Sequence, residues 1–263
     1  MALILKKIYK SYFFLTVDSV DHDYVENWTH SPLFVVSFIA GYLFIVKKLG
    51  PKFMENRKPY NIRKLLIVYN VIQILINLKL TYEAFLTIQA SPYTLCVQSP
   101  LRDLVYSTRQ QYFALKLLDS METVFFVLRK SDRQVSFLHV YHHGIMIFTG
   151  WVGAKYDLGD TIMLIGVLNC FIHVIMFVYY LLTSIDSAWK KSVFLKKTLT
   201  TLQLIQFLSL ILIYTFESII PDCKTFPSVI AFLFIIQNMF MFCLFSEFYY
   251  KTYWKEDKNR KMS

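Results

Sequence analysis

The stretch TIMLIGVLNCFIHVIMFVYYLLT, residues 161–183, contains no Asp, Glu, Lys or Arg. A helix needs about 20 mostly apolar residues to cross the hydrocarbon core of a bilayer, so this stretch predicts a membrane span. Asn169 and His173, two of its few polar side chains, are four residues apart and therefore share one helical face. The sequence thus predicts a membrane helix that carries a polar stripe.

Six further apolar stretches flank this one along the chain. The predicted spans are 32–49, 65–89, 112–129, 136–154, 161–183, 198–220 and 228–250. With 56% hydrophobic and 17% charged residues, the 263-residue chain carries more apolar surface than a soluble domain can bury. We therefore predict an all-α membrane protein with a lumenal N-terminal segment (1–31), a seven-helix transmembrane domain (32–250) and a basic cytosolic tail (251–263).

The net charge of +10 bears on orientation. Of the 28 Lys and Arg residues, 19 lie in or beside the first, third and fifth connections and the tail, and 7 lie on the other side. Positive charge is retained on the cytoplasmic side of a membrane, which predicts a cytosolic C-terminus and a lumenal N-terminus. The excess of basic residues is a topology signal, and we expect no nucleic-acid partner.

Three short features agree with this orientation. Asn27 opens the glycosylation sequon Asn-Trp-Thr in the predicted lumenal segment. Cys96 and Cys223 both fall in predicted lumenal connections, where the environment is oxidising, so a Cys96–Cys223 disulfide is one hypothesis and two free thiols are the other. The tail sequence 260–263, Arg-Lys-Met-Ser, is close to a dilysine retrieval signal and favours the endoplasmic reticulum.

The main chemical candidate is His139-Val140-Tyr141-His142-His143, here called the histidine box, which opens the fourth predicted span. The spacing places all three histidines on one helical face near its cytosolic end. An ionisable residue at membrane depth costs about 2.5–3.5 kcal/mol, so such residues mark a site by default. Each imidazole also has a polar edge that needs a partner.

A second polar cluster lies in the third predicted span. Lys116, Asp119 and Thr123 follow one stripe, and Glu122 lies beside it. A functional site is one interpretation. The other is an internal Lys–Asp ion pair that ties helices together.

Two further clusters follow in the fifth and sixth spans. In the fifth, Tyr180 extends the Asn169–His173 stripe, with Tyr179 next to it. In the sixth, Thr200, Gln203 and Gln206 form either a substrate-binding face or a polar seam between helices.

The histidine count narrows the chemistry. The chain has six histidines, of which four lie in these clusters, and a di-iron desaturase or hydroxylase site needs more imidazole ligands than that. A mononuclear zinc or iron site remains an alternative by geometry. Cys170, three residues before His173, is a competing nucleophile, although a thiol at membrane depth keeps a high pKa without a nearby cation. A seven-helix receptor or transporter is the non-enzymatic alternative.

Four blocks resemble the signatures of the ELO family, the very-long-chain fatty acid elongases of the endoplasmic reticulum. They are HVYHH (139–143), KLLDSMET (116–123), NCFIHVIMFVYY (169–180) and TTLQLIQF (200–207). The loop GPKFMENRKPYNIR (50–63) and the basic tail are also similar, and the resemblance extends over about residues 24–255. The segment YLFIVKKLGPKFM (42–54), which leads into this loop, is most similar to the insect-type branch. Two departures are Phe177, where the family usually has Tyr, and Asp157-Leu158-Gly159-Asp160 in place of a glycine-rich stretch.

The resemblance implies a decarboxylative condensation of a long-chain acyl-CoA with malonyl-CoA, catalysed by a bundle of helices around an acyl-CoA tunnel. It assigns the nucleophile to His142, which would form an acyl-imidazole. His173 would face it as acid/base or as a donor to the thioester enolate. His139 and His143 would orient or protonate their neighbours, and Asp119 would fix a tautomer.

The resemblance also implies the substrate-binding set and the partners. The expected substrate-binding residues are Lys116, Asp119, Glu122, Thr123, Asn169, Tyr179, Tyr180, Gln203 and Gln206. We expect no cofactor and no metal beyond the two CoA substrates. The expected partners are membrane lipids, the 3-oxoacyl-CoA reductase, dehydratase and enoyl reductase of the elongation cycle, and a second copy of the chain.

Overall fold

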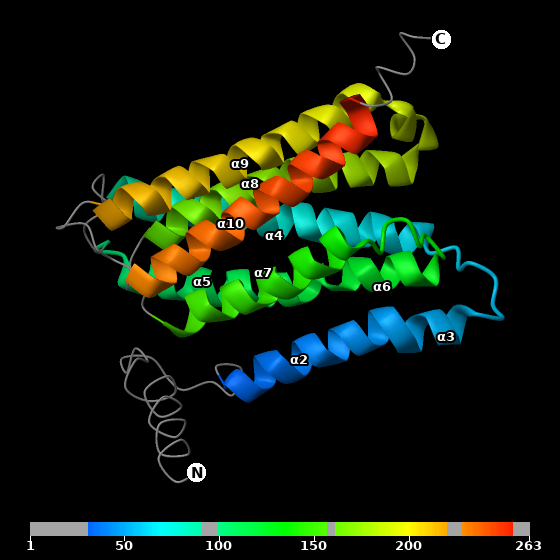
Figure 1. Ribbon diagram of the computed structural model, residues 1–263, viewed down its shortest axis with the longest axis horizontal. Coiled ribbons are helices and arrows are strands. Elements are labelled where there is room, and N and C mark those ends of the chain that lie inside the picture. Colours follow the sequence, from blue (N-terminus) through cyan, green and yellow to red (C-terminus); the bar gives the residue numbers. More distant parts are fainter. Residues whose placement is uncertain (1–30, 91–98, 157–160, 220–227, 255–263) are drawn as a thin grey trace. The chain divides into compact units, whose positions relative to one another are not determined.

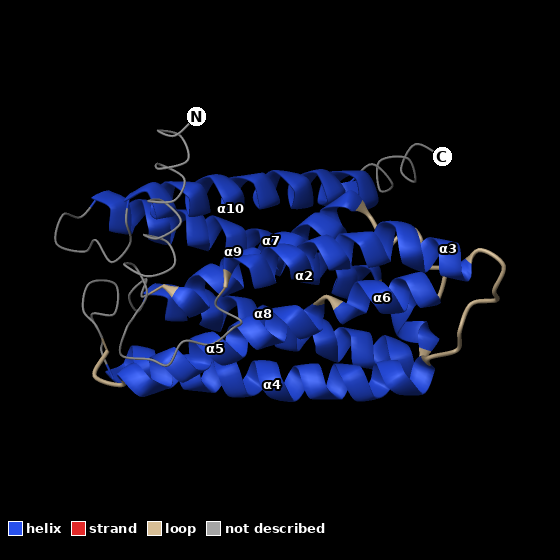
Figure 2. Cartoon of the chain, turned by 90° about the horizontal axis from the view of Figure 1, so that it is seen from below, coloured by secondary structure: helices blue, strands red, loops and turns tan. Residues whose placement is uncertain are grey.

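The structure is a computed structural model, and its described residues form helices joined by short loops, with no β-strand among them (Figure 2). The described ranges are 31–90, 99–156, 161–219 and 228–254. The chain divides into two compact units, Met1–Tyr60 with Arg109–Leu158 and Asn61–Thr108 with Gly159–Ser263. Helix α5 (Arg102–Asp119) begins in the second unit and ends in the first.

The first unit opens with a long helix that has three parts: α2 (Pro32–Phe44), the π-helical segment η3 (Ile45–Leu49) and α3 (Gly50–Met54). The Ser31 hydroxyl caps its start by accepting a hydrogen bond from the Leu33 amide. Pro32 suits the first turn because an N–H there would have no partner within the helix. The length and the apolar composition of this three-part helix both suit a membrane span.

Two shorter helices complete the first unit, α6 (Met121–Leu128) and α7 (Phe137–Lys155). Helix α2 contacts α7, and α3 contacts α6. The buried side chains form two clusters. One comprises Val35, Phe113, Ile147, Trp151 and Ala154, and the other comprises Tyr42, Val46, Met54, Val127 and Val140. The second cluster places α2 and η3 beside the start of α7, where the histidine box lies.

The second unit is built from long helices (Figure 1). They are α4 (Arg63–Ala90), α8 (Thr161–Ile185), α9 (Val193–Ile219) and α10 (Ser228–Tyr249), with the short 3-10 turn η4 (Ser187–Lys191) and the π-helical end η6 (Tyr250–Trp254). Helix α8 packs along α4, and α9 packs against both α8 and α10. The stacked rings of Tyr214 and Phe234, 5.1 Å apart, join α9 to α10.

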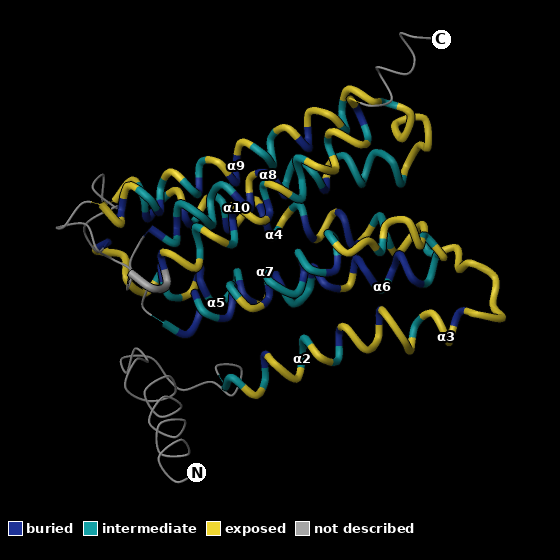
Figure 3. The backbone as a smooth tube through the Cα atoms, in the orientation of Figure 1, coloured by how far each residue is buried: buried dark blue, intermediate teal, exposed yellow. Residues whose placement is uncertain are grey.

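Five of the described helices are long and apolar enough to cross a membrane. They cover Pro32–Met54, Arg63–Ala90, Thr161–Ile185, Val193–Ile219 and Ala231–Trp254, which agrees with the first, second, fifth, sixth and seventh predicted spans. Helices α2 and α10 carry large apolar side chains that are exposed along much of each helix (Figure 3). Such surface suits contact with lipid rather than water.

The prediction of one continuous helix over 112–129 is wrong. Helix α5 ends at Asp119 and α6 begins at Met121. At the break the Thr123 amide donates to the Ser120 carbonyl, which is the i→i+3 bond of a tighter turn, and the Ser120 hydroxyl donates to the Leu117 carbonyl. Helix α5 also begins earlier than predicted, at Arg102, with a polar first half. The fourth predicted span, 136–154, coincides with α7 but is not among the five. Seven spans and a central tunnel therefore stay predictions.

Candidate functional site

The histidine box lies in the first two turns of α7. Ser136 caps this helix, since its hydroxyl accepts a hydrogen bond from the His139 amide at 3.2 Å. The helix then brings the rings together as the spacing predicts. The centroids of His139 and His143 are 4.4 Å apart, and those of His142 and His143 are 5.5 Å apart. The three imidazoles therefore form one array.

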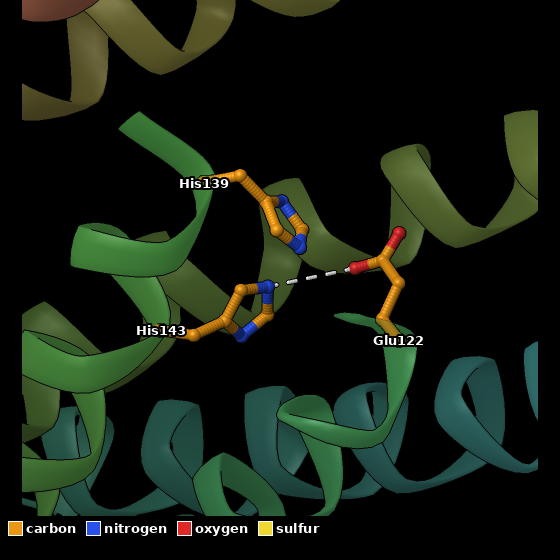
Figure 4. A group of neighbouring side chains, drawn as sticks. All are labelled: Glu122, His139 and His143. Carbon is orange, nitrogen blue, oxygen red and sulfur yellow. Dashed lines mark ion pairs between the residues drawn. The ribbon is translucent and has the colours of Figure 1, made fainter. Parts of the chain in front are cut away.

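Helix α6 supplies a carboxylate and a hydroxyl to this array. Glu122 Oε2 lies 3.7 Å from His143 Nε2, and the two rings of α7 and the Glu122 carboxylate point toward one another (Figure 4). Thr123 Oγ1 lies 3.0 Å from His139 Nε2. The Phe126 ring packs on His139 with a centroid distance of 5.1 Å. Glu122, Thr123 and the histidine box, predicted from separate motifs, belong to one cluster.

Tyr42 is a member of this cluster that sequence reasoning missed. Its hydroxyl lies 2.9 Å from Thr123 Oγ1, so a hydrogen-bonded chain connects α2 through α6 to His139. Tyr42 is buried, and a buried phenol hydroxyl needs a partner. The available signal in the sequence was a phenol hydroxyl within a helix whose other side chains, apart from Ser37, are apolar.

Three side chains of this cluster are also a candidate metal-binding group. One ligand atom each from Glu122, His139 and His143 lies within 4.8 Å of the others. Imidazole nitrogen and carboxylate oxygen are the donors that zinc accepts in catalytic sites. Thr123, however, already occupies the Nε2 edge of His139.

The ion pair considered for Lys116 and Asp119 is present. Lys116 Nζ lies 3.0 Å from Asp119 Oδ2, and Lys116 is only 1% exposed. Both residues belong to α5, so the pair does not tie helices together. A Cβ at Gly150 of α7 would lie 3.5 Å from Lys116 Cγ, which shows how closely α7 covers the lysine stem. The Lys116 ammonium also lies 4.6 Å from the centroid of the Tyr112 ring.

The remaining predicted residues belong to the second unit. On α8, Asn169 and His173 are buried, and Tyr179 and Tyr180 are half-buried. Phe177, the departure from the family pattern, is buried at 1% exposure, with ring centroids 5.8 Å from His173, 6.0 Å from Tyr180 and 6.0 Å from Tyr69 of α4. Where the family usually has the hydroxyl of a tyrosine, Phe177 offers only its aromatic contacts with His173, Tyr180 and Tyr69.

The α9 residues lie as expected for a helix with one polar face. Gln206 and Thr200 are buried and Gln203 is half-buried. The Thr200 hydroxyl donates to the Lys196 carbonyl at 3.0 Å, within its own helix. Cys170 of α8 is buried at 1% exposure. Asn27, Cys96 and Cys223 lie outside the described residues, so the glycosylation and disulfide hypotheses stay as they were.

Helix α4 carries a polar face that sequence reasoning missed. Asn70, Gln73 and Asn77 are all buried, the last two completely. The Asn77 amide donates to the Gln73 carbonyl at 2.8 Å, and the Gln73 amide donates to the Tyr69 hydroxyl at 2.9 Å. The i, i+3, i+7 spacing within an apolar span was a readable signal for this face.

The predicted site residues thus form two sets. The first unit holds the histidine box with Lys116, Asp119, Glu122 and Thr123. The second unit holds Asn169, His173, Tyr179, Tyr180, Gln203 and Gln206. Each set combines buried ionisable or amide groups with apolar helices.

Apolar helices with an array of one buried and two half-buried histidines define a multi-pass membrane protein with a polar site. Residues 27–261 match the ELO: GNS1/SUR4 family, and the chain belongs to that family. It is 35% identical to a very long chain fatty acid elongase of Aedes aegypti over 99% of this chain and 74% of the relative. It is 39% identical to very long chain fatty acid elongase 4 of Homo sapiens over 90% of this chain and 77% of the relative. With very long chain fatty acid elongase F of Drosophila melanogaster the identity is 36% over 93% and 96%.

Proposed function

We propose that this protein is a very-long-chain fatty acid elongase. In the proposed reaction a long-chain acyl-CoA and malonyl-CoA give a 3-oxoacyl-CoA longer by two carbons, with release of CoA and CO2. Family membership and the elongase names of its relatives support elongation. The observation that supports the chemistry most directly is the array of three imidazoles in the first turns of α7.

The proposed route has two half-reactions. In the first, a neutral nitrogen of His142 attacks the acyl thioester, the C–S bond breaks, and the CoA thiolate leaves with a proton. In the second, malonyl-CoA loses CO2, its enolate attacks the acyl carbon, the C–N bond to His142 breaks, and the departing imidazolate takes up a proton from solvent. His173 serves as acid/base or as the donor to the enolate oxygen.

The neighbours of His142 have a positioning role in this proposal. The Thr123 hydroxyl holds the Nε2 edge of His139, and Glu122 faces His143. The rings of His139 and His143 lie beside one another, and His143 lies beside His142. Fixing the first two rings therefore limits the rotation of the His142 ring, the proposed nucleophile. Lys116, Asn169 and Gln206 are the proposed contacts for the CoA and malonyl groups.

The proposed location is the endoplasmic-reticulum membrane, with a lumenal N-terminus and a cytosolic C-terminus. The excess of basic residues in the first, third and fifth connections and the tail supports this orientation, and the tail sequence supports the endoplasmic reticulum. There the protein would act with the 3-oxoacyl-CoA reductase, dehydratase and enoyl reductase that consume its product.

The test is a condensation assay on microsomes that contain the full chain, with labelled malonyl-CoA and a panel of saturated acyl-CoAs of increasing length. Mass spectrometry identifies the 3-oxo product. We expect extension by the wild type and by Cys170→Ala, and loss in His142→Ala and His173→Ala. Equal loss in Cys170→Ala would assign the nucleophile to the thiol instead.

The Glu122, His139 and His143 group favours one alternative, a metal-dependent lipid oxidoreductase. The same microsomes distinguish it. Oxygen-dependent desaturation or hydroxylation of the acyl chain, with no incorporation of malonate, would replace the elongase proposal.

A further inference from the structure

A cavity of ≈ 360 Å³ lies within the first unit, between the end of the first helix and the loop that joins α6 to α7. Its volume falls within the range of about 300–1,000 Å³ that small-molecule sites occupy. Its apolar lining comes from Val46, Pro51, Met54, Val127 and Val135, and its charged lining from Lys47, Glu55, Lys130 and Asp132. None of these residues belongs to the proposed elongation site.

The backbone departs from regular α-helical geometry at two points around this cavity, and Gly50 makes a close contact between them. The helix is π-helical over Ile45–Leu49, and the Gly50 amide donates to the Ile45 carbonyl. A Cβ at Gly50 would lie 2.8 Å from that oxygen and 2.7 Å from Val127 Cγ1, so only glycine fits. Lys130, on the opposite wall, has a φ of 52°. Single π turns and left-handed residues occur often at functional sites.

The two lysines connect the walls of the cavity. Lys47 Nζ donates to the Val135 carbonyl at 3.4 Å, and Lys130 Nζ donates to the Glu55 carbonyl at 3.2 Å. An ammonium has three donors, so each lysine keeps N–H groups for a ligand. Within the described part of the chain, the carboxylates of Glu55 and Asp132 take part in no ion pair. The charged lining is therefore two cations and two anions that do not neutralise one another in direct pairs.

The cavity also lies where a membrane surface is expected. It is lined by the last residues of the candidate span Pro32–Met54. The apolar side chains of Leu49 and Phe53, beside it in sequence, are 51% and 44% exposed. Lys48, Lys52 and Arg57 follow on the same segment. A lipid with its tails along this helix would have its headgroup at the cavity.

We propose that this cavity binds the headgroup of phosphatidylethanolamine, a zwitterionic phospholipid with a primary ammonium. The phosphate accepts hydrogen bonds from Lys47 and Lys130, and the lipid ammonium donates to Glu55 and Asp132. An anionic headgroup would leave the two carboxylates opposite a phosphate without a cation. The quaternary ammonium of phosphatidylcholine has no N–H to donate. This inference goes beyond the proposed function and does not depend on it.

Native mass spectrometry of the full-length protein in detergent tests this proposal without an activity readout. The probes are phosphatidylethanolamine, phosphatidylcholine and phosphatidylglycerol with identical acyl chains, added in equal amounts. We expect the wild type to retain phosphatidylethanolamine between roughly threefold and tenfold more than either competitor, the size of a partly exposed charged contact. Equal retention of the three lipids, or retention of none, would overturn the proposal.

Variants locate the lipid. The pair Glu55→Gln with Asp132→Asn is expected to remove the preference over phosphatidylcholine and to raise retention of phosphatidylglycerol. The pair Lys47→Met with Lys130→Met is expected to lower retention of all three lipids. The matched control for the second pair is Lys64→Met with Arg133→Met, which removes two exposed charges outside the lining.

The control for the carboxylates is Glu247→Gln on α10, an exposed carboxylate outside the lining. Unchanged unfolding temperatures show that the variants keep their fold. If a folded carboxylate variant keeps the wild-type preference, the headgroup does not bind here.

Discussion

Thr123 Oγ1 lies 3.0 Å from His139 Nε2, and the same hydroxyl lies 2.9 Å from the hydroxyl of Tyr42. A histidine of α7 is therefore oriented by a side chain of α6, which is itself held by a side chain of α2. One nitrogen of a neutral imidazole donates a hydrogen bond and the other accepts one. The Tyr42–Thr123–His139 hydrogen bonds therefore also influence which tautomer His139 adopts. The histidine box thus has supporting partners outside its own motif.

Removing the hydrogen bonds between Tyr42, Thr123 and His139 one at a time should lower turnover in steps. Tyr42→Phe takes one partner from Thr123, and Thr123→Val takes the partner from His139. A net hydrogen bond contributes about 0.5–1.5 kcal/mol, so we expect kcat to fall roughly two- to twelvefold for Tyr42→Phe and further for Thr123→Val. Measuring kcat and KM with labelled malonyl-CoA separates positioning from substrate binding, because KM should change little.

Tyr82→Phe is the matched control, because Tyr82 is 62% exposed on α4. It removes the same hydroxyl without touching the histidine box, and its kcat should equal that of the wild type. A Tyr42→Phe enzyme with wild-type kcat would show that the hydroxyl only packs.

Metal removal should leave elongation intact. The acyl-imidazole route uses the imidazole nitrogens directly, and Thr123 already holds one of those that a metal would need. We expect purified protein to contain substoichiometric zinc and iron by elemental analysis, and to keep its activity after dialysis against a chelator. One equivalent of metal that is lost in Glu122→Gln, together with activity restored by that metal, would favour the metal-dependent alternative.

Hydropathy was sufficient to predict most of the fold. Five predicted spans coincide with long apolar helices, because the length of an apolar run reports directly on its ability to cross a bilayer. The break at Ser120 was not predictable in this way. The Ser120 hydroxyl bonds the Leu117 carbonyl at the break, but Thr87 makes the same kind of bond to Ala84 inside the unbroken helix α4, so the residue type alone does not mark a break.

The candidate site could be predicted within each helix but not between helices. The His139–His143 contact follows from the i, i+4 spacing, which every α-helix imposes. The Tyr42–Thr123 contact joins residues 81 positions apart, and a single sequence holds no periodicity that reports on such a pair. The buried amides Gln73 and Asn77 could have been predicted, because their spacing places them on one helical face within an apolar span.

Gly50→Ala should destabilise the protein where other helical glycines tolerate alanine. A Cβ there would lie 2.7 Å from Val127 Cγ1 and 2.8 Å from the Ile45 carbonyl oxygen, and the backbone oxygen cannot rotate away. Overpacking of this kind costs about 1–3 kcal/mol, which should lower the unfolding temperature in detergent. Gly41→Ala, with no atom within 4 Å of its Cβ position, should be neutral or stabilising. Equal effects of the two substitutions would contradict the close packing of α3 on α6.

Arg63 should stabilise the C-terminal end of α8. Its Nε donates to the Ser184 carbonyl at 2.7 Å, and a second guanidinium nitrogen donates to the Ile185 carbonyl. These are carbonyls of the last helical turn, which have no partner within the helix, and a cation there also favours the helix dipole. Arg63→Met should therefore cost about 0.3–1 kcal/mol of stability from the helix dipole at low ionic strength, and about 0.5–1.5 kcal/mol more for each hydrogen bond that is lost.

Lys64→Met provides the comparison for Arg63, because Lys64 is the next residue on α4 and is also exposed. It removes the same charge, but no hydrogen bond from it to α8 is present among the described contacts. We expect its unfolding temperature to match the wild type at every salt concentration. The deficit of Arg63→Met should shrink as salt is added, because salt screens the part that comes from the dipole, and the part due to the two hydrogen bonds should remain. A deficit shared equally by Lys64→Met would mean that the charge alone matters, and that the contact with α8 contributes nothing.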